Sequence, residues 1–208
     1  MLVVVVMAVA LLGPSCSKPT PKSELQILFE KGIELQRQGD LQGSLDSFDR
    51  VIQMDPGLAE AYHSRGLIYG TMNKLDLAMQ DLNTALGKDP GMARAYVDRG
   101  WVHEKLGELT EAVEDYTTAI SKDPNLVEAY YARGIDYYRV NKLDLALDDL
   151  SKGISIAPGD PRLYLIRASV YVLIHNDTAA KEDLKKVLSL SNDPETIRRA
   201  MTILSGLR

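Results

Sequence analysis

Two residue types that can bind anions or transfer protons recur at a fixed interval in this chain. An arginine returns at a constant spacing along four consecutive segments, and an aspartate follows each arginine at a second constant spacing. One interpretation is an anion-binding or catalytic row. The other is a ladder of ion pairs between helices, which four equal copies favour over a single active site. The residues of this ladder are Arg65, Arg99, Arg133 and Arg167 with Asp81, Asp115, Asp149 and Asp183.

The histidines do not have the arrangement of a metal site. His63, His103 and His175 occupy three different positions within the repeating period, so they do not gather on one face. His103 stands at a core aromatic position, which predicts a hydrogen-bonded core histidine. The chain also lacks a glycine-rich phosphate loop and a Gly-x-Ser-x-Gly motif. We therefore expect no metal, no cofactor, no small-molecule substrate and no enzymatic activity.

Charge and cysteine content narrow the function further. The net charge is −5, and the chain has no run of five or more Lys and Arg residues. Both observations argue against a nucleic-acid-binding surface. The one cysteine, Cys16, cannot form an intramolecular disulfide or a cysteine-based zinc site. Packing must therefore stabilise the fold.

The N-terminal segment differs from the rest of the chain. Residues 2–12 are apolar, but this run is much shorter than the roughly 20 residues that span a bilayer as a helix. Its length and position are typical of the apolar region of a secretory signal peptide. The following residues are rich in Pro, Lys and Ser, which disfavours packing. We expect a signal peptide over residues 1–15 and a flexible tether over residues 16–24.

Cys16 lies at the boundary of that segment and resembles the lipidated cysteine of bacterial lipoproteins. The resemblance implies a lipid anchor that holds the chain to a membrane, facing the periplasm or the exterior. The preceding residues depart from the usual lipoprotein pattern, because Gly13, Pro14 and Ser15 precede the cysteine and Leu12 lies one place too early. Gly13 and Ser15 also suit an ordinary signal-peptidase site, so a soluble periplasmic or secreted protein is the alternative.

From residue 25 onward the chain is a repeat of constant period, which is the spacing between Pro56, Pro90, Pro124 and Pro158. Each unit has two runs with helical spacing of apolar residues, such as 25–38 and 41–54. Between the runs stands a residue that tolerates the left-handed conformation at a helix end, namely Gly39, Asn73, Gly107, Asn141 or, less typically, His175. We predict five units and a capping helix, with bounds 25–58, 59–92, 93–126, 127–160, 161–193 and 194–208.

The pattern within each unit resembles the tetratricopeptide repeat. That family has a large residue, a small residue, an aromatic residue, two alanines around a large residue, and a proline at fixed spacing. The second unit supplies Tyr62, Gly66, Tyr69, Ala78, Leu82, Ala85 and Pro90. The resemblance implies an all-α, right-handed α-solenoid of stacked antiparallel helix pairs. An array of this kind needs different elements at its ends, and the segment after Asp193 has the signals of a capping helix.

In this family the first helix of each unit lines a concave groove that binds protein segments. The resemblance therefore implies a partner-binding groove formed by Phe29, Ile33, His63, Leu67, Val97, Trp101, Tyr131, Ile135 and Tyr138. Trp101 is the single tryptophan, and tryptophan is enriched among residues that dominate binding energy. We expect it to form an aromatic shelf with Val97, Tyr131, Ile135 and Tyr138.

These expectations define two functional hypotheses. The first is a non-enzymatic adaptor or scaffold of the bacterial cell envelope, whose groove binds an apolar segment of a partner protein. The alternative is a structural envelope protein that associates with itself through its apolar faces and has no separate ligand.

Overall fold

The structure is a computed structural model that describes residues 23–207. The predicted signal peptide, Cys16 and all but the last two residues of the predicted tether lie outside this range. Within the range the chain forms helices and no strand. They are α1 (Glu24–Arg37), α2 (Leu41–Met54), α3 (Ala59–Thr71), α4 (Leu75–Lys88), α5 (Ala93–Leu106), α6 (Leu109–Lys122), α7 (Val127–Arg139), α8 (Leu143–Ile156), α9 (Pro161–Leu173), α10 (Asp177–Leu190) and α11 (Pro194–Gly206).

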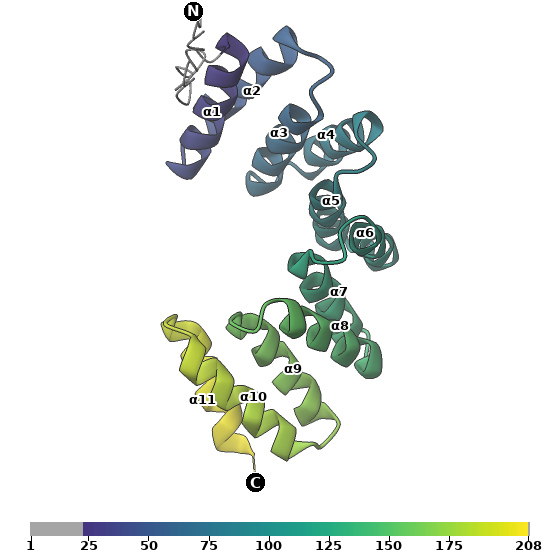
Figure 1. Cartoon of the computed structure of the whole chain (residues 1–208), viewed down its shortest axis with the longest axis vertical. Coiled ribbons are helices and arrows are strands. Elements are labelled where there is room, and N and C mark those ends of the chain that lie inside the picture. Colours follow the sequence, from purple (N-terminus) through teal and green to yellow (C-terminus); the bar gives the residue numbers. More distant parts are fainter. Residues whose placement is uncertain (1–22, 208) are drawn as a thin grey trace, which may run out of the picture.

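The helices pack as consecutive pairs that form an arc (Figure 1). The first helix of each unit contacts its own second helix and the first helix of the next unit. In Figure 1, α1, α3, α5 and α7 face the hollow of the arc, and α2, α4, α6 and α8 lie on its outer side. We call the surface that the first helices turn to the hollow the inner face. The predicted all-α solenoid of stacked helix pairs is confirmed.

The helix boundaries follow from residues that stop a helix. The first helix of each unit is followed by a residue with positive φ, at Gly39, Asn73, Gly107, Asn141 and His175. Glycine and asparagine adopt this conformation at low cost, and His175 is the exception. The second helices of the first three units end before an Asp-Pro step, where the aspartate is extended.

Both ends of the array have side-chain caps. Helix α1 starts at Glu24 because the Ser23 hydroxyl accepts a hydrogen bond from the Gln26 N–H at 3.2 Å. Glu24, the last residue of the predicted tether, 16–24, thus belongs to α1. At the other end, the Asp193 carboxylate accepts from the Thr196 N–H at 2.8 Å and starts α11. Helix α11 packs against α9 and α10 and covers the apolar face of the last unit.

Small residues let the two helices of a unit approach closely. A Cβ atom added to Gly100 would lie 2.6 Å from the ring of Tyr116, and one added to Gly32 would lie 2.9 Å from Phe48. Larger residues there would force the helices apart. Two of the recurring tyrosines at the start of the first helices also close the turn before them. The hydroxyls of Tyr130 and Tyr164 donate to the carbonyls of Pro124 and Pro158 at 3.2 and 3.1 Å.

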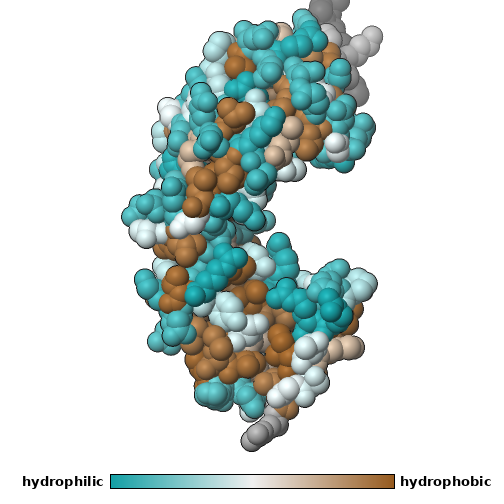
Figure 2. Space-filling view, turned by 180° about the vertical axis from the view of Figure 1, so that it is seen from behind, coloured by the Kyte–Doolittle hydropathy of each residue, from teal (hydrophilic) through white to brown (hydrophobic). Residues whose placement is uncertain are grey.

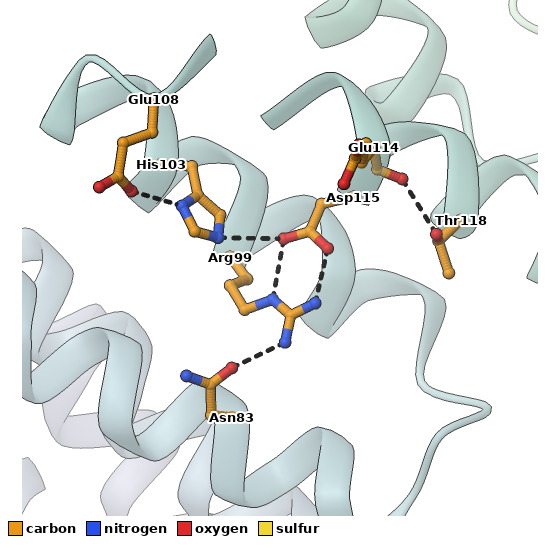
Figure 3. Close-up of polar contacts among 7 residues, drawn as sticks. All are labelled: Asn83, Arg99, His103, Glu108, Glu114, Asp115 and Thr118. Atoms are coloured by element: carbon orange, nitrogen blue, oxygen red, sulfur yellow. Dashed lines mark hydrogen bonds and ion pairs between the residues drawn. The ribbon is translucent and has the colours of Figure 1, made fainter. Parts of the chain in front are cut away.

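Each ladder arginine binds acceptors on two different helices. In the third unit, Nε and Nη2 of Arg99 donate to the two carboxylate oxygens of Asp115 at 2.8 and 2.7 Å (Figure 3). Its Nη1 donates to Asn83 of the preceding unit at 2.7 Å. The arginine therefore joins three helices, α4, α5 and α6. Equivalent sets are Arg65 with Asp81 and Asp49, Arg133 with Asp149 and Thr117, and Arg167 with Asp183 and Ser151.

The hydrogen bonds to Asp115 raise the pKa of Arg99, and the equivalent aspartates raise the pKa of the other ladder arginines. The first unit departs from the pattern because Lys31 and Ser47 stand at the two positions. Lys31 is exposed, and the Ser47 hydroxyl donates to the Gly43 carbonyl of its own helix. The helices of that unit are held together without a ladder pair.

Replacing Arg99 by Ala should destabilise the fold because it leaves the Asp115 carboxylate buried without its counter-charge. Removing one partner of a fully buried pair costs about 3–5 kcal/mol. We expect about 3 kcal/mol here, since the Arg99 side chain is 23% exposed. The control is Arg37→Ala, whose exposed pair with Glu34 should contribute about 0–1 kcal/mol. Urea unfolding measures both, and equal losses would contradict a structural role for the ladder.

Candidate functional site

The predicted groove residues lie on α1, α3, α5 and α7, and several of them also pack against the core. Phe29 and Ile33 pack into the core around Phe48, and the rings of Phe29 and Phe48 meet edge to face at 5.4 Å. Tyr131 and Tyr138 pack in the cluster around Leu150 and Leu163. Ile135 is half-buried on α7. These residues at the two ends of the row have substantial roles in packing.

Trp101 turns towards the preceding unit. Its ring lies over Gly70 of α3, so closely that a Cβ atom added there would be 3.0 Å from Cζ3 of the indole. The missing side chain at Gly70 leaves the space that the ring occupies. Tyr131 instead lies beside Arg162, whose guanidinium carbon is 5.1 Å from the ring centre. The shelf of Trp101 with Val97, Tyr131, Ile135 and Tyr138 stays a prediction.

A pocket of about 260 Å³ opens beside Trp101, between α3 and α5. Its walls are mostly apolar, and the Trp101 side chain remains 38% exposed. The ammonium group of Lys105 lies 5.3 Å from the indole ring. The pocket can hold an apolar side chain against the indole. Its lining residues are Gly66, Leu67, Gly70, Thr71, Leu82, Asp98, Trp101 and Val102.

A second pocket of about 220 Å³ continues from the first, because Leu67 and Asp98 line both. It contains the predicted residues His63 and Val97 and adds Arg94, Leu126 and Glu128. His63 Nε2 lies 2.6 Å from a carboxylate oxygen of Asp98. The two pockets together give an apolar depression with charged groups along part of its wall. Figure 2 shows the hollowed outline of the arc from behind.

Sequence reasoning missed Asp98. The equivalent positions of the other units hold Glu30, Ser64, Ala132 and Ile166, so this position has no fixed residue type. One signal could have found it. Asp98 directly follows the predicted groove residue Val97, and a histidine, His63, stands at the groove position of the previous unit. The sequence alone does not bring Asp98 next to His63, because 35 residues separate them.

His103, expected to be a hydrogen-bonded core histidine, is hydrogen-bonded but only half-buried. Nδ1 of His103 lies 2.7 Å from Glu108, and Nε2 lies 3.7 Å from the ladder residue Asp115 (Figure 3). In residues 23–207 no three His, Cys, Asp or Glu side chains come together as metal ligands would. The described helices also include none that is both long and apolar enough to span a bilayer.

Comparison with known protein families identifies the repeat. Residues 59–91 match the family model described as tetratricopeptide repeat, and residues 105–141 match a second model described as TPR repeat. The chain therefore carries tetratricopeptide repeats. No curated protein matches the chain.

Solved structures show the same fold. One is PilW, a widely conserved type IV pilus biogenesis factor, with a TM-score of 0.78 and 20% identity over 89% of this chain and 86% of PilW. Another is MamA, with a TM-score of 0.67 and 24% identity over 86% of this chain and 94% of MamA. A third is YrrB, a TPR protein with an unusual peptide-binding site, with a TM-score of 0.65 and 21% identity over 84% of this chain and 90% of YrrB. The chain is thus similar to tetratricopeptide solenoids over most of its length.

Gly70→Ala should displace the Trp101 ring because the added methyl group would meet the indole at 3.0 Å. We expect the Trp101 fluorescence spectrum to change. We also expect the free energy of unfolding to rise by less than the about 0.5–1 kcal/mol that Gly→Ala gives at an open helix position. Gly87→Ala is the matched control, since nothing lies within 4 Å of its added Cβ atom. It should stabilise the fold and leave the spectrum unchanged. Identical spectra for both variants would contradict the close packing of Gly70 and Trp101.

Proposed function

We propose that this chain is a non-enzymatic adaptor of the bacterial cell envelope, whose inner face around Trp101 binds an apolar segment of another protein. The observation that carries the proposal is the pocket of about 260 Å³ beside a tryptophan that remains 38% exposed. A partner that removes an exposed indole from water gains substantial binding energy. An apolar side chain of the partner would lie between Trp101 and Leu67.

The charged groups next to the pocket support a peptide as the ligand. An extended segment carries backbone N–H and carbonyl groups that need hydrogen-bond partners once water is excluded. The Asp98 carboxylate and the Arg94 guanidinium stand beside the second pocket and offer an acceptor and a donor. The peptide-binding site of YrrB, on a similar solenoid, is consistent with such a ligand. The ladder arginines favour a non-enzymatic role, because Nε, Nη1 and Nη2 of each one donate to structural acceptors.

The proposed location rests on the sequence before residue 23. A short apolar run that ends near Cys16 supports export and lipidation, and the similar fold of PilW, a type IV pilus biogenesis factor, fits a bacterial envelope setting. Two or more acyl chains give stable membrane attachment, whereas one gives only marginal attachment. A tether of a few residues would keep the first unit close to the membrane surface.

Trp101→Ala should abolish partner capture and leave the fold intact. Truncation of a central binding tryptophan costs at least about 2 kcal/mol, or roughly thirtyfold in affinity. The measurement is a pull-down from detergent-solubilised envelopes, followed by affinity measurements with the recovered segment. Leu145→Ala is the control, because Leu145 is a similarly exposed apolar residue on the outer helix α8.

Three results would contradict the groove assignment. A Trp101→Ala variant that unfolds would make Trp101 structural, and a folded variant that binds normally would move the binding surface elsewhere. If sedimentation shows concentration-dependent oligomers that Trp101→Ala abolishes, self-association is the function instead. A concentration-independent monomer of the repeat region contradicts that alternative.

Cys16→Ala should release the protein from membranes, because the substitution removes the atom that carries the lipid. Membrane fractionation and mass spectrometry of the mature N-terminus test this expectation. A wild-type protein in the soluble fraction, with an unmodified N-terminus after Ser15, would show ordinary secretion and contradict the anchor. The substitution should not affect partner binding by the purified repeats.

A further inference from the structure

An acidic side chain stands at a core position of the fourth unit. Asp136 on α7 is 1% exposed, and the equivalent positions of the second, third and fifth units hold Ile68, Val102 and Val170, which are fully or almost fully buried. The first unit also holds an acid there, but Glu34 is exposed. Oδ1 of Asp136 accepts a hydrogen bond from Arg139 at 3.2 Å. Oδ2 is buried and accepts no hydrogen bond. A buried carboxylate oxygen without a partner is costly, so this position calls for a specific explanation.

A second carboxyl group faces Asp136 from the third unit. Glu104 on α5 accepts from Arg139 at 2.5 Å and from the hydroxyl of Tyr116 on α6 at 2.9 Å. Tyr116 is itself the one phenol at a core position that holds Phe48, Leu82, Leu150 and Leu184 in the other units. Polar residues on three helices thus depart from the repeat together at the joint between the third and fourth units.

The charges of this cluster do not balance if both carboxyl groups are ionised. Arg139 supplies one positive charge and is 54% exposed, so water weakens its effect. Burial, followed by the hydrogen bond and charge of Glu104, raises the pKa of Asp136 to about 7. Burial and the Glu104 charge also raise the pKa of Tyr116, which therefore stays a hydrogen-bond donor. Glu114 of α6 and Lys142, just before α8, line the cleft of about 230 Å³ that Asp136 also borders.

We propose that Glu104 and Asp136 share one proton and thereby make the joint between the third and fourth units dependent on pH. With the proton bound, the Asp136 carboxyl group donates to the Glu104 carboxylate, and the pair keeps one negative charge opposite Arg139. When the proton leaves, two carboxylates face each other in a buried joint and repel. The contact between α5 and α7 then weakens, and water from the neighbouring cleft can solvate Asp136.

The joint lies close to the candidate site. Glu104 follows Trp101 by three residues on α5, so both side chains depend on the position of the same helix. A change in the packing of α5 on α7 would alter the inner face at Trp101. Regulation of binding by this pair rests on the proposed function, whereas the shared proton itself does not.

The direction of the pH effect follows from the two states. An aspartate in the unfolded chain loses its proton near pH 3.9, and Asp136 in the folded chain holds it to about pH 7. Between these values the folded state binds more protons, so the free energy of unfolding falls as pH rises. Mild acid therefore tightens the joint, and pH values above about 7 loosen it.

The test compares the wild type with Asp136→Asn in the absence of any ligand. Asparagine has the shape of a protonated aspartate and can donate to Glu104 at every pH. The unfolding equilibrium constant of the wild type should rise at least about tenfold more than that of Asp136→Asn between about pH 5 and about pH 8. Asp148→Asn, an exposed acid of the same unit, should keep the wild-type dependence. The histidines are present in all three proteins, so their titration cancels in the comparison.

Equal pH dependence in the wild type and Asp136→Asn would overturn the proposal. If Asp136→Asn does not fold, Glu104→Gln tests the same pair, with the same expected and contradicting results. Trp101 fluorescence gives an independent measure, since its pH-dependent change should be smaller in Asp136→Asn. Partner affinity is measured separately at both pH values. If the wild type captures no partner through Trp101 at either pH, only the proposed function is contradicted. If the pH dependence of unfolding is the same in the wild type and in Asp136→Asn, only the shared proton is contradicted.

Discussion

The geometry of the arc depends on the guanidinium groups of the ladder. Two N–H groups of Arg99 bind both oxygens of Asp115, and among side chains a carboxylate is the group that presents two acceptors at the matching spacing. The third donor needs a single acceptor on the preceding unit, and there the residue type varies between Asp49, Asn83, Thr117 and Ser151. One side chain thus sets the distance between the two helices of a unit and the step to the unit before it. The same contacts pair the charges of the ladder, so its Arg and Asp side chains can be partly buried.

A backbone held in this way allows the inner face to differ from unit to unit. Gly70 and Trp101 make an apolar pocket at one joint, and Glu104 and Asp136 make a polar contact at the next. Neither pair recurs, yet the helices around them keep the same spacing because the ladder and the small-residue positions maintain it. The residues that occur in one unit alone are concentrated between the second and fourth units, in the middle of the arc. The ends of the row, at Phe29 and Tyr131, contribute more to packing.

The fold could be predicted because its determinants are repeated. The helix-stop residues, the small residues and the Arg and Asp positions each recur with the same period, so each copy reinforces the others. The site was harder to predict because its determinants occur once. Trp101 turns to α3 because Gly70, on the first helix of the preceding unit, has no side chain, and spacing alone does not show which neighbour leaves room. Asp98 and Asp136 look like ordinary variation until the structure shows His63 and Glu104 beside them. The second acceptor of each arginine was also hidden, because four chemically different residues fill that role.

The departure at Lys31 and Ser47 has a mechanical consequence. A solenoid is a linear chain of units, and its stability is approximately a sum of unit and neighbour contributions. The first unit keeps its link to the second through Arg65 and Asp49, but α1 is joined to α2 without a bidentate ion pair. A pulling force applied at residue 23 would therefore peel α1 away first and leave the later units folded. Unfolding of α1 would lengthen the chain under force before the units in the middle of the arc begin to unfold.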